Sequence, residues 1–254
     1  PPRSTLFPYT TLFRSHPKGN NTFADNFSMY GKPYFFQDLS LQRAGYTYDY
    51  FSPLLLEDGE NVSWTGSSLQ PNGPDYRAII VYQEMMELSA AKKLLEIASD
   101  GLPVVFVNNN TEILCHDGAV IANKKAASVS RHLGDSDEEL NRVAAEIKKL
   151  PNVREVDSPD KALEAVRSLG VEPRAAFAQP NDSILTMSRL DRENGILYTF
   201  AYAYKFAVEK GGPACTFTLE LEGEGNPYFI DPWSGKVEKS GLYCRQKGRT
   251  SIEL

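Results

Sequence analysis

The chain has 254 residues, of which 41% are hydrophobic and 24% are charged, and its 27 Lys and Arg residues against 33 Asp and Glu residues give a formal net charge of −6. This composition is typical of a globular protein of one or two domains and excludes a disordered or collagen-like chain. The negative balance argues against binding to nucleic acid or to an anionic membrane, and no run approaches the roughly 18 apolar residues of a transmembrane helix.

Both ends of the chain carry unusual sequence patterns. Residues 5–15 read Thr-Leu-Phe-Pro-Tyr-Thr-Thr-Leu-Phe-Arg-Ser, and one reverse translation of this stretch resembles a common short-read sequencing adapter. We therefore expect residues 1–15 to be an artefact with few contacts to either core, the alternative being a natural strand with a chance repeat. Residues 249–254 alternate like a strand with no turn after them. We expect the chain to be an internal fragment of a larger protein.

Strand and helix patterns alternate in the first half of the chain. Short apolar runs are typical of strands buried on both faces of a parallel sheet, and helical apolar spacing with end signals marks the helices between them. The predicted elements are, in chain order, a helix over 34–44 with Gly45 as its C-cap, a strand at 46–51, a strand at 77–82, a helix over 87–99, a strand at 103–107, a helix over 136–150, a strand at 153–156 and a helix from Pro159 that ends at Gly170.

This β–α–β–α order predicts a doubly wound α/β domain, with its elements over about residues 34–170 and its bounds at 16–172. We expect 77–82 and 103–107 to be adjacent parallel strands, with 46–51 in the same sheet. Residues 173–182, which begin with Pro173 and include Pro180, read as a linker.

The hydrophobic period changes to two after the linker. Alternating segments separated by turn residues predict a small antiparallel, β-sandwich-like domain over 182–254, truncated at its C-terminus. Its predicted strands are 184–189, 197–206, 216–221, 228–230 and 236–238, with a turn at 191–195 and another at Asp231-Pro-Trp-Ser-Gly235, in which we expect Trp233 to pack.

The sequence offers few motifs that could carry out catalysis. The sequence holds no dinucleotide fingerprint, phosphate-binding Walker loop or nucleophile elbow, and its three histidines lack metal-site spacing. Cys115, His116 and Asp117 form the only compact trio of reactive types, but adjacent residues rarely reach each other, so a plain loop is favoured over a nucleophile. Glu84 and Glu87 follow the strand at 77–82, where loop and helix-start roles are favoured over acid–base work.

The three cysteines are too few and too scattered for a disulfide framework. Cys215 and Cys244 both fall in the predicted β domain and could form a bridge. Idle thiols are the favoured interpretation.

Aromatic residues occupy alternate positions in the strand at 197–206. The residues are Tyr198, Phe200, Tyr202, Tyr204 and Phe206, which therefore share one face. Such a face fills a core, stacks on sugar rings, or contacts another domain. The core is favoured, because Thr199 and Lys205 fall on the other side, and we expect Phe200 and Tyr202 to be among the most buried residues of the domain.

The order of these motifs resembles the region after the catalytic barrel in α-L-rhamnosidase-like glycoside hydrolases of family 106. The matching stretches are 42–51, 70–74, 76–82, 101–107, 189–200 and 228–235, the last with an Asp-Pro-x-x-Gly turn. The resemblance covers roughly residues 34–254 and implies a flavodoxin- or amidotransferase-like α/β domain. A similar domain follows the barrel of family-42 β-galactosidases, which is a neighbouring possibility.

The resemblance implies a non-catalytic accessory region of a carbohydrate-active enzyme, with the barrel upstream on the same polypeptide as its partner and a carbohydrate as ligand. The family's acid, base and metal-binding residues belong to that barrel, so no catalytic, cofactor-binding or metal-binding residue is carried over to this chain. The alternatives are a stand-alone carbohydrate-binding module and, as a less favoured one, an amidotransferase-like enzyme that uses Cys115. Whether the chain is itself an enzyme, and its compartment, stay open.

Overall fold

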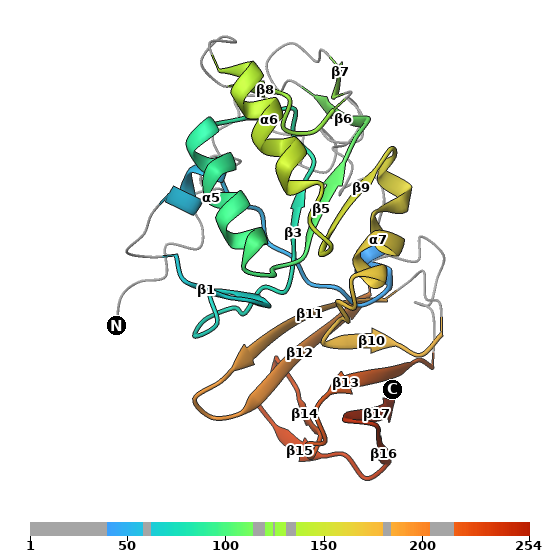
Figure 1. Ribbon diagram of the computed structural model, residues 1–254. Helices are drawn as coiled ribbons and strands as arrows, with labels where there is room; N and C mark the ends of the chain where they lie inside the picture. Colours follow the sequence, from blue (N-terminus) through green and yellow to red (C-terminus); the bar gives the residue numbers. More distant parts are fainter. Residues whose placement is uncertain are drawn as a thin grey trace, which may run out of the picture.

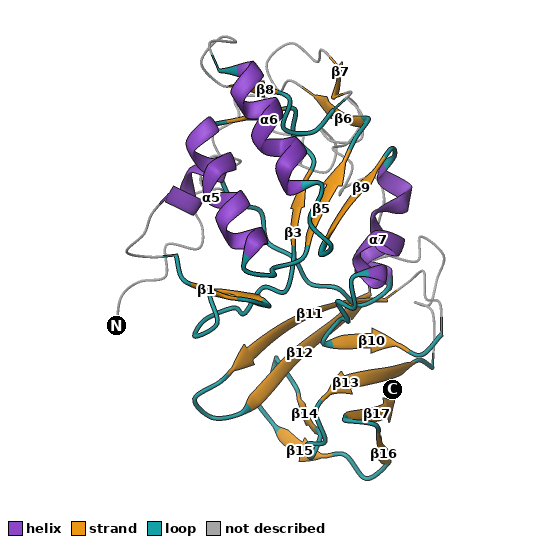
Figure 2. Cartoon of the chain, viewed as in Figure 1, coloured by secondary structure: helices purple, strands orange, loops and turns teal. Residues whose placement is uncertain are grey.

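The structure is a computed structural model, which describes residues 40–57, 62–113, 120–123, 125–130, 136–179, 184–203 and 216–254. Helices and a parallel sheet occupy the first half of the chain, and antiparallel strands occupy the second half (Figure 1). Figure 2 shows the same division by element type. Residues 1–15, and with them the predicted artefact, lie outside the described part.

A parallel sheet of three strands forms the centre of the first half. The strands are β3 (Ile79–Val81), β5 (Val104–Val107) and β9 (Val153–Val156), in the order β3-β5-β9. Ile79 pairs with Val104, and Val104 pairs with Val153. The expected parallel pairing of 77–82 with 103–107 is therefore confirmed. β5 is central, and all four of its residues are buried, as its continuous apolar run predicts.

Helices cover both faces of this sheet. α5 (Leu88–Ser99) and α6 (Asp137–Ile147) lie on one face, where Phe106 of β5 packs against them. α7 (Ala162–Ser168) and the short α4 (Ser40–Arg43) lie on the other, where Val105 and Val107 point. Successive residues of β5 thus serve two cores, because strand side chains alternate between faces. A 3-10 turn, η2 (Pro159–Lys161), leads into α7.

The doubly wound class stays a prediction, because a doubly wound sheet reverses its strand order. The order β3-β5-β9 runs in one direction, and no strand in the described part of the chain pairs with the other edge of β3. Reversal would require a strand at that edge.

Residues 46–51 do not form the predicted strand. Their backbone is irregular, and their polar groups bond to other segments. The Tyr46 hydroxyl donates to the carbonyl oxygen of Val171 at 2.7 Å, and the amide of Ser188 donates to Thr47 Oγ1 at 2.8 Å. These contacts hold the segment away from the sheet, so the strand propensity of its aromatic residues is overridden by tertiary structure.

Several short elements were not predicted from the sequence. They are η1 (Pro53–Glu57), the antiparallel pairs β1 (Trp64–Thr65) with β2 (Ser68–Leu69) and β6 (Asn110–Ile113) with β7 (Val120–Asn123), and the parallel pair β4 (Met85–Met86) with β8 (Val129–Ser130). Segments of two to five residues are too short to show a hydrophobic period, which explains why the sequence pattern did not predict them.

A four-stranded antiparallel sheet begins inside the predicted linker. Its order is β10 (Ala175–Phe177), β13 (Thr218–Glu222), β17 (Arg249–Glu253) and β16 (Tyr243–Gln246). The linker prediction is wrong at β10, which pairs residue for residue with β13. Ala175 is fully buried, which shows how a short Ala-rich stretch can be core rather than linker.

Two further hairpins complete the second half. β11 (Ile184–Asp191) pairs with β12 (Ile196–Ala203), and β14 (Tyr228–Ile230) pairs with β15 (Val237–Lys239). The predicted turn at 191–195 is confirmed, with the amide of Asn194 donating to Asp191 Oδ1 at 3.1 Å. The described strands of this half form three separate antiparallel sheets, and packing as a sandwich stays a prediction.

Gly45 ends α4 as predicted. Its φ is +96°, and its amide donates to the carbonyl oxygen of Gln42 at 2.9 Å. A Cβ at this position would lie 1.9 Å from the carbonyl oxygen of Ala175 in β10. The glycine therefore allows the first half of the chain to approach the second closely.

We expect Gly45→Ala to lower the free energy of unfolding by about 2 kcal/mol, from strain at positive φ together with the clash. Gly170 is the matched control, because its φ is +72° and a Cβ there would meet nothing within 4 Å. Gly170→Ala should cost only about 1 kcal/mol, the backbone part alone. Urea denaturation of both variants measures the difference, and equal losses would show that the contact with Ala175 is unimportant.

Candidate functional site

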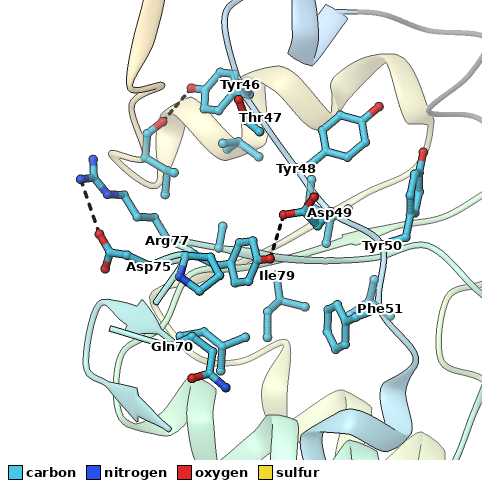
Figure 3. Close-up of a pocket in the computed structure, with 18 of the residues that line it drawn as sticks. Tyr46, Thr47, Tyr48, Asp49, Tyr50, Phe51, Gln70, Asp75, Arg77 and Ile79 are labelled. Atoms are coloured by element: carbon cyan, nitrogen blue, oxygen red, sulfur yellow. Dashed lines mark hydrogen bonds and ion pairs between the residues drawn. The ribbon is translucent and has the colours of Figure 1, made fainter. Parts of the chain in front are cut away.

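A cavity of about 610 Å³ lies between β3 and residues 46–51 (Figure 3). One wall is the continuous stretch 75–83, which contains β3, and the opposite wall is 46–51. Ser188 and Arg189 of β11 also belong to the lining, so the second half of the chain contributes to it. The volume lies in the range typical of small-molecule or peptide sites.

The deeper lining comes from both cores of the first half. Leu56, Met86 and Leu94 belong to the core under α5, and Val166 and Val171 belong to the core under α7. The cavity therefore passes around the edge of the sheet and opens onto both helix layers.

Asp49 is the polar centre of the cavity wall. Its Oδ2 accepts a hydrogen bond from the Tyr76 hydroxyl at 2.8 Å, and its Oδ1 pairs with Arg189 at 3.0 Å. Figure 3 shows Asp49 pointing from its segment toward the strand. Burial, and after it the hydrogen bond and charge of Asp49, raises the pKa of Tyr76 to about 12. The phenol therefore stays protonated at neutral pH and keeps donating to the carboxylate.

A cluster of charges joins the two halves of the chain next to the cavity. We name it the charged cluster; its members are Asp75, Arg77, Arg174, Arg192 and Glu222. The Arg174 guanidinium donates to Asp75 Oδ2 at 2.6 Å and to Glu222 Oε2 at 2.9 Å. Glu222 also pairs with Arg77, and Asp75 with Arg192.

Asp75 is only 7% exposed and also accepts a hydrogen bond from Ser68. Burial acts to raise the pKa of Asp75, but the bonds from Ser68 and Arg174 and the charges of Arg192 and Arg174 outweigh it, so the pKa lies below its ordinary value. A carboxylate held ionised by two arginines is poorly suited to donate a proton, so the charged cluster is an architectural link between the halves.

The aromatic face of β12 contradicts the sequence expectation. Tyr198, Phe200 and Tyr202, which we name the aromatic row, are 47%, 57% and 37% exposed, so the predicted core role is wrong. The rings of Phe200 and Tyr202 stack with their centroids 5.8 Å apart and an interplanar angle of 19°, which confirms that they share a face. Tyr204 and Phe206 lie outside the described residues.

The reason for this inversion lies in β11. Thr186 and Ser188 point to the opposite face of the hairpin and are each 5% exposed. Ser188 donates its backbone amide to Thr47, and the hydroxyls of Ser188 and Thr199 lie 3.2 Å apart. The hairpin thus packs its small polar side against the first half of the chain and leaves its aromatic side open.

The hairpin β14–β15 is also exposed and apolar. Its exposed large apolar residues are Tyr228, Phe229, Ile230 and Val237, and Trp233 in the connecting turn is 96% exposed. The predicted turn is confirmed, because the amide of Gly235 donates to the carbonyl oxygen of Asp231 at 2.8 Å. The expectation that Trp233 packs there is wrong: the turn points its indole into solvent.

The remaining sequence candidates form no site in the described residues. Cys115, His116, Asp117 and Cys215 lie outside them, and Cys244 is exposed and free, without a bridge. Glu84 lies just before β4, and Glu87 is the residue before α5. Among the residues that the structure describes, no group of three or more His, Cys, Asp or Glu side chains could hold a metal ion. None of the described helices is long and apolar enough to cross a membrane.

Asp49, Tyr76 and the charged cluster were not predicted from the sequence as members of a site. A usable signal was present at Asp49, the single charge within the aromatic run 46–51. The charged cluster gave no such signal, because its members are spread from residue 75 to residue 222 and meet only in the fold.

Comparisons with known proteins give no family for the chain. No protein-family model matches it, and no curated protein has a significantly similar sequence. The resemblance to α-L-rhamnosidase-like enzymes therefore stays a prediction.

Proposed function

We propose that the chain is a non-catalytic, sugar-binding accessory region of a glycoside hydrolase of the α-L-rhamnosidase-like kind. The catalytic barrel that the resemblance implies upstream is part of this proposal. The observation that carries it is the open aromatic row on β12.

The aromatic row has the properties of a sugar platform. Tyr198, Phe200 and Tyr202 lie along one strand face, so their rings follow one another as the units of a glycan chain do. The C–H faces of a sugar ring are apolar and pack on an aromatic ring, while its hydroxyls reach polar groups at the rim. Arg189 pairs with Tyr198 across the hairpin and is half exposed, which places a hydrogen-bond donor beside the row.

The two aspartates of the cavity wall are held by arginines. Hydrolysis of a glycoside requires two carboxyl groups about 5–10 Å apart, one of which can be protonated. Around the cavity, Asp49 and Asp75 are each engaged with arginines. They are better suited to holding structure than to proton transfer.

A second observation supports membership of a larger protein. The apolar residues of β14–β15, together with Trp233 and Leu242, add exposed apolar surface to that of the aromatic row. Isolated monomeric proteins rarely leave extended apolar surface uncovered, whereas domains of a larger protein cover it with a neighbour. This favours the accessory region over the stand-alone module.

The sugar-binding role is tested by Phe200→Ala on an array of plant and bacterial polysaccharides that includes rhamnose-containing glycans. We expect wild type to bind at least one glycan and Phe200→Ala to weaken binding about fivefold, through loss of one stacking ring worth on the order of 1 kcal/mol.

Tyr228→Ala is the matched control, because Tyr228 is an aromatic residue of 56% exposure on another hairpin, against 57% for Phe200. Its glycan binding should equal that of wild type. If the wild-type protein binds no glycan on the array, or if both variants lose glycan binding equally, the sugar-platform proposal is contradicted.

A further inference from the structure

One edge of the parallel sheet is open. The amide of Ile79 donates to the carbonyl oxygen of Pro103 at 2.9 Å, and Ile79 and Val81 face β5 in the parallel register. The backbone groups of Ala78 and Ile80 therefore point away from β5, because successive peptide groups of a strand alternate in direction. Within the described residues, no backbone group pairs with them.

The cavity lies along this open edge. It is lined by the stretch 75–83, which contains β3, and it reaches apolar side chains of both helix layers. A strand added to a sheet lies about 4.8 Å from its neighbour and sends alternate side chains to the two faces. The cavity has the position and the two-sided lining that such a strand would occupy.

The neighbouring segment 46–51 does not fill the position. Tyr46, Thr47 and Asp49 are bonded to Val171, Ser188 and Arg189 respectively. Those partners lie outside the stretch 75–83 and hold the segment as the far wall of the cavity, which the side chain of Tyr76 reaches through its hydrogen bond to Asp49.

We propose that the cavity is a strand-addition site, which binds an extended polypeptide segment with apolar side chains at its central positions. The peptide backbone would pair with Ala78 and Ile80, and alternate side chains would enter the layers of α5 and α7. The ligand is a peptide because half-buried N–H and C=O groups in an apolar wall are matched by another backbone. A helix, at about 10–12 Å across, is too wide for a strand position.

The strand-addition site is independent of the sugar-binding proposal. No residue of the aromatic row lines the cavity, so either proposal can fail without the other. Phe200→Ala, the sugar-platform variant, should therefore leave peptide binding unchanged.

The test uses the full chain and a fluorescein-labelled peptide of sequence Lys-Val-Val-Thr-Val-Val-Lys with blocked ends. We expect a saturable rise in fluorescence anisotropy, together with at least tenfold slower hydrogen exchange of the Ile80 amide at saturation. The same peptide methylated on alternate backbone nitrogens should bind at least tenfold more weakly, because it keeps the side chains and loses the backbone donors.

Ile80→Pro provides the matching change on the protein. Proline is tolerated on edge strands where the N–H faces outward, and it removes the donor that the peptide would meet. We expect at least tenfold weaker binding, with Ile80→Val unchanged. If Ile80→Pro fails to fold, the methylated peptide still decides the question on unaltered protein.

Three results would overturn the proposal. One is equal binding of the methylated and unmethylated peptides. Another is no binding of the peptide at concentrations up to about 1 mM. The third is an Ile80 amide that is already protected without peptide, which would show that the protein's own chain fills the position.

Discussion

Replacing Phe106 by alanine is expected to lower the free energy of unfolding by about 3–5 kcal/mol. Phe106 is fully buried in the central strand β5 and packs in the core under α5 and α6. Removing its ring leaves a cavity that the rigid sheet and two helices cannot close, so the loss of burial and the cost of the void add together.

Phe200→Ala is the matched comparison for the Phe106 variant. Phe200 is 57% exposed, so the same change should cost less than about 1 kcal/mol. Urea denaturation followed by circular dichroism gives both values. A loss at Phe200 as large as that at Phe106 would mean that the aromatic row is buried in solution and would restore the core role expected from the sequence.

Replacing Asp75 by asparagine is expected to lower the free energy of unfolding by about 3 kcal/mol, because Arg174, which is only 13% exposed, then faces a neutral amide. Asparagine is the suitable replacement, because Asp75 has a φ of +57° and asparagine tolerates this region better than alanine does. Asp157→Asn is the control: Asp157 forms an exposed pair with Lys161, so its loss should shift the urea midpoint far less.

The contribution of Asp75 depends on pH. Because folding lowers the pKa of Asp75, its ionised form is favoured in the folded state. This stabilisation is fully present above the unfolded pKa of about 3.9 and is lost as the pH falls through the lower folded value. The difference in midpoint between wild type and Asp75→Asn should therefore be constant from pH 7 to about pH 5 and shrink below about pH 4. A difference that stays constant at low pH would assign the loss to packing instead.

Local sequence patterns were sufficient to predict the central strands and helices of the first half of the chain. The Val- and Ile-rich runs at 79–81 and 104–107 predicted buried parallel strands, because a strand covered on both faces has no polar side. The helices α5 and α6 followed from their 3.6-residue period, and Gly45 followed from the need for positive φ after a helix.

Patterns could not decide which face of β12 is inside. Alternation correctly placed Tyr198, Phe200 and Tyr202 together, but the choice of face was made by the partner strand. Ser188 of β11 donates its backbone amide to Thr47 in the segment 46–51, and the side of the hairpin with Thr186 and Ser188 is the buried one. The same segment explains the wrong strand at 46–51, since its bonds run to residues more than a hundred positions away. Long-range contacts of this kind cannot be predicted from the hydrophobic pattern of a short stretch of sequence.

The short strand β10 has a consequence for the modular history of the protein. A domain that is shuffled between genes must be cut where few contacts cross, in an exposed linker. Residues 173–182 look like such a linker, but they include the strand β10 of the four-stranded sheet. The backbone of Ala175 in this stretch lies against Gly45, and Arg174 forms an ion pair with Asp75. A cut before Arg174 would separate the buried carboxylate of Asp75 from its arginine partners, and a cut after β10 would leave β13 with an open sheet edge. The two halves are therefore expected to be inherited together, with exchange confined to the turn of β14–β15, since the turn of β11–β12 holds Arg192 of the charged cluster.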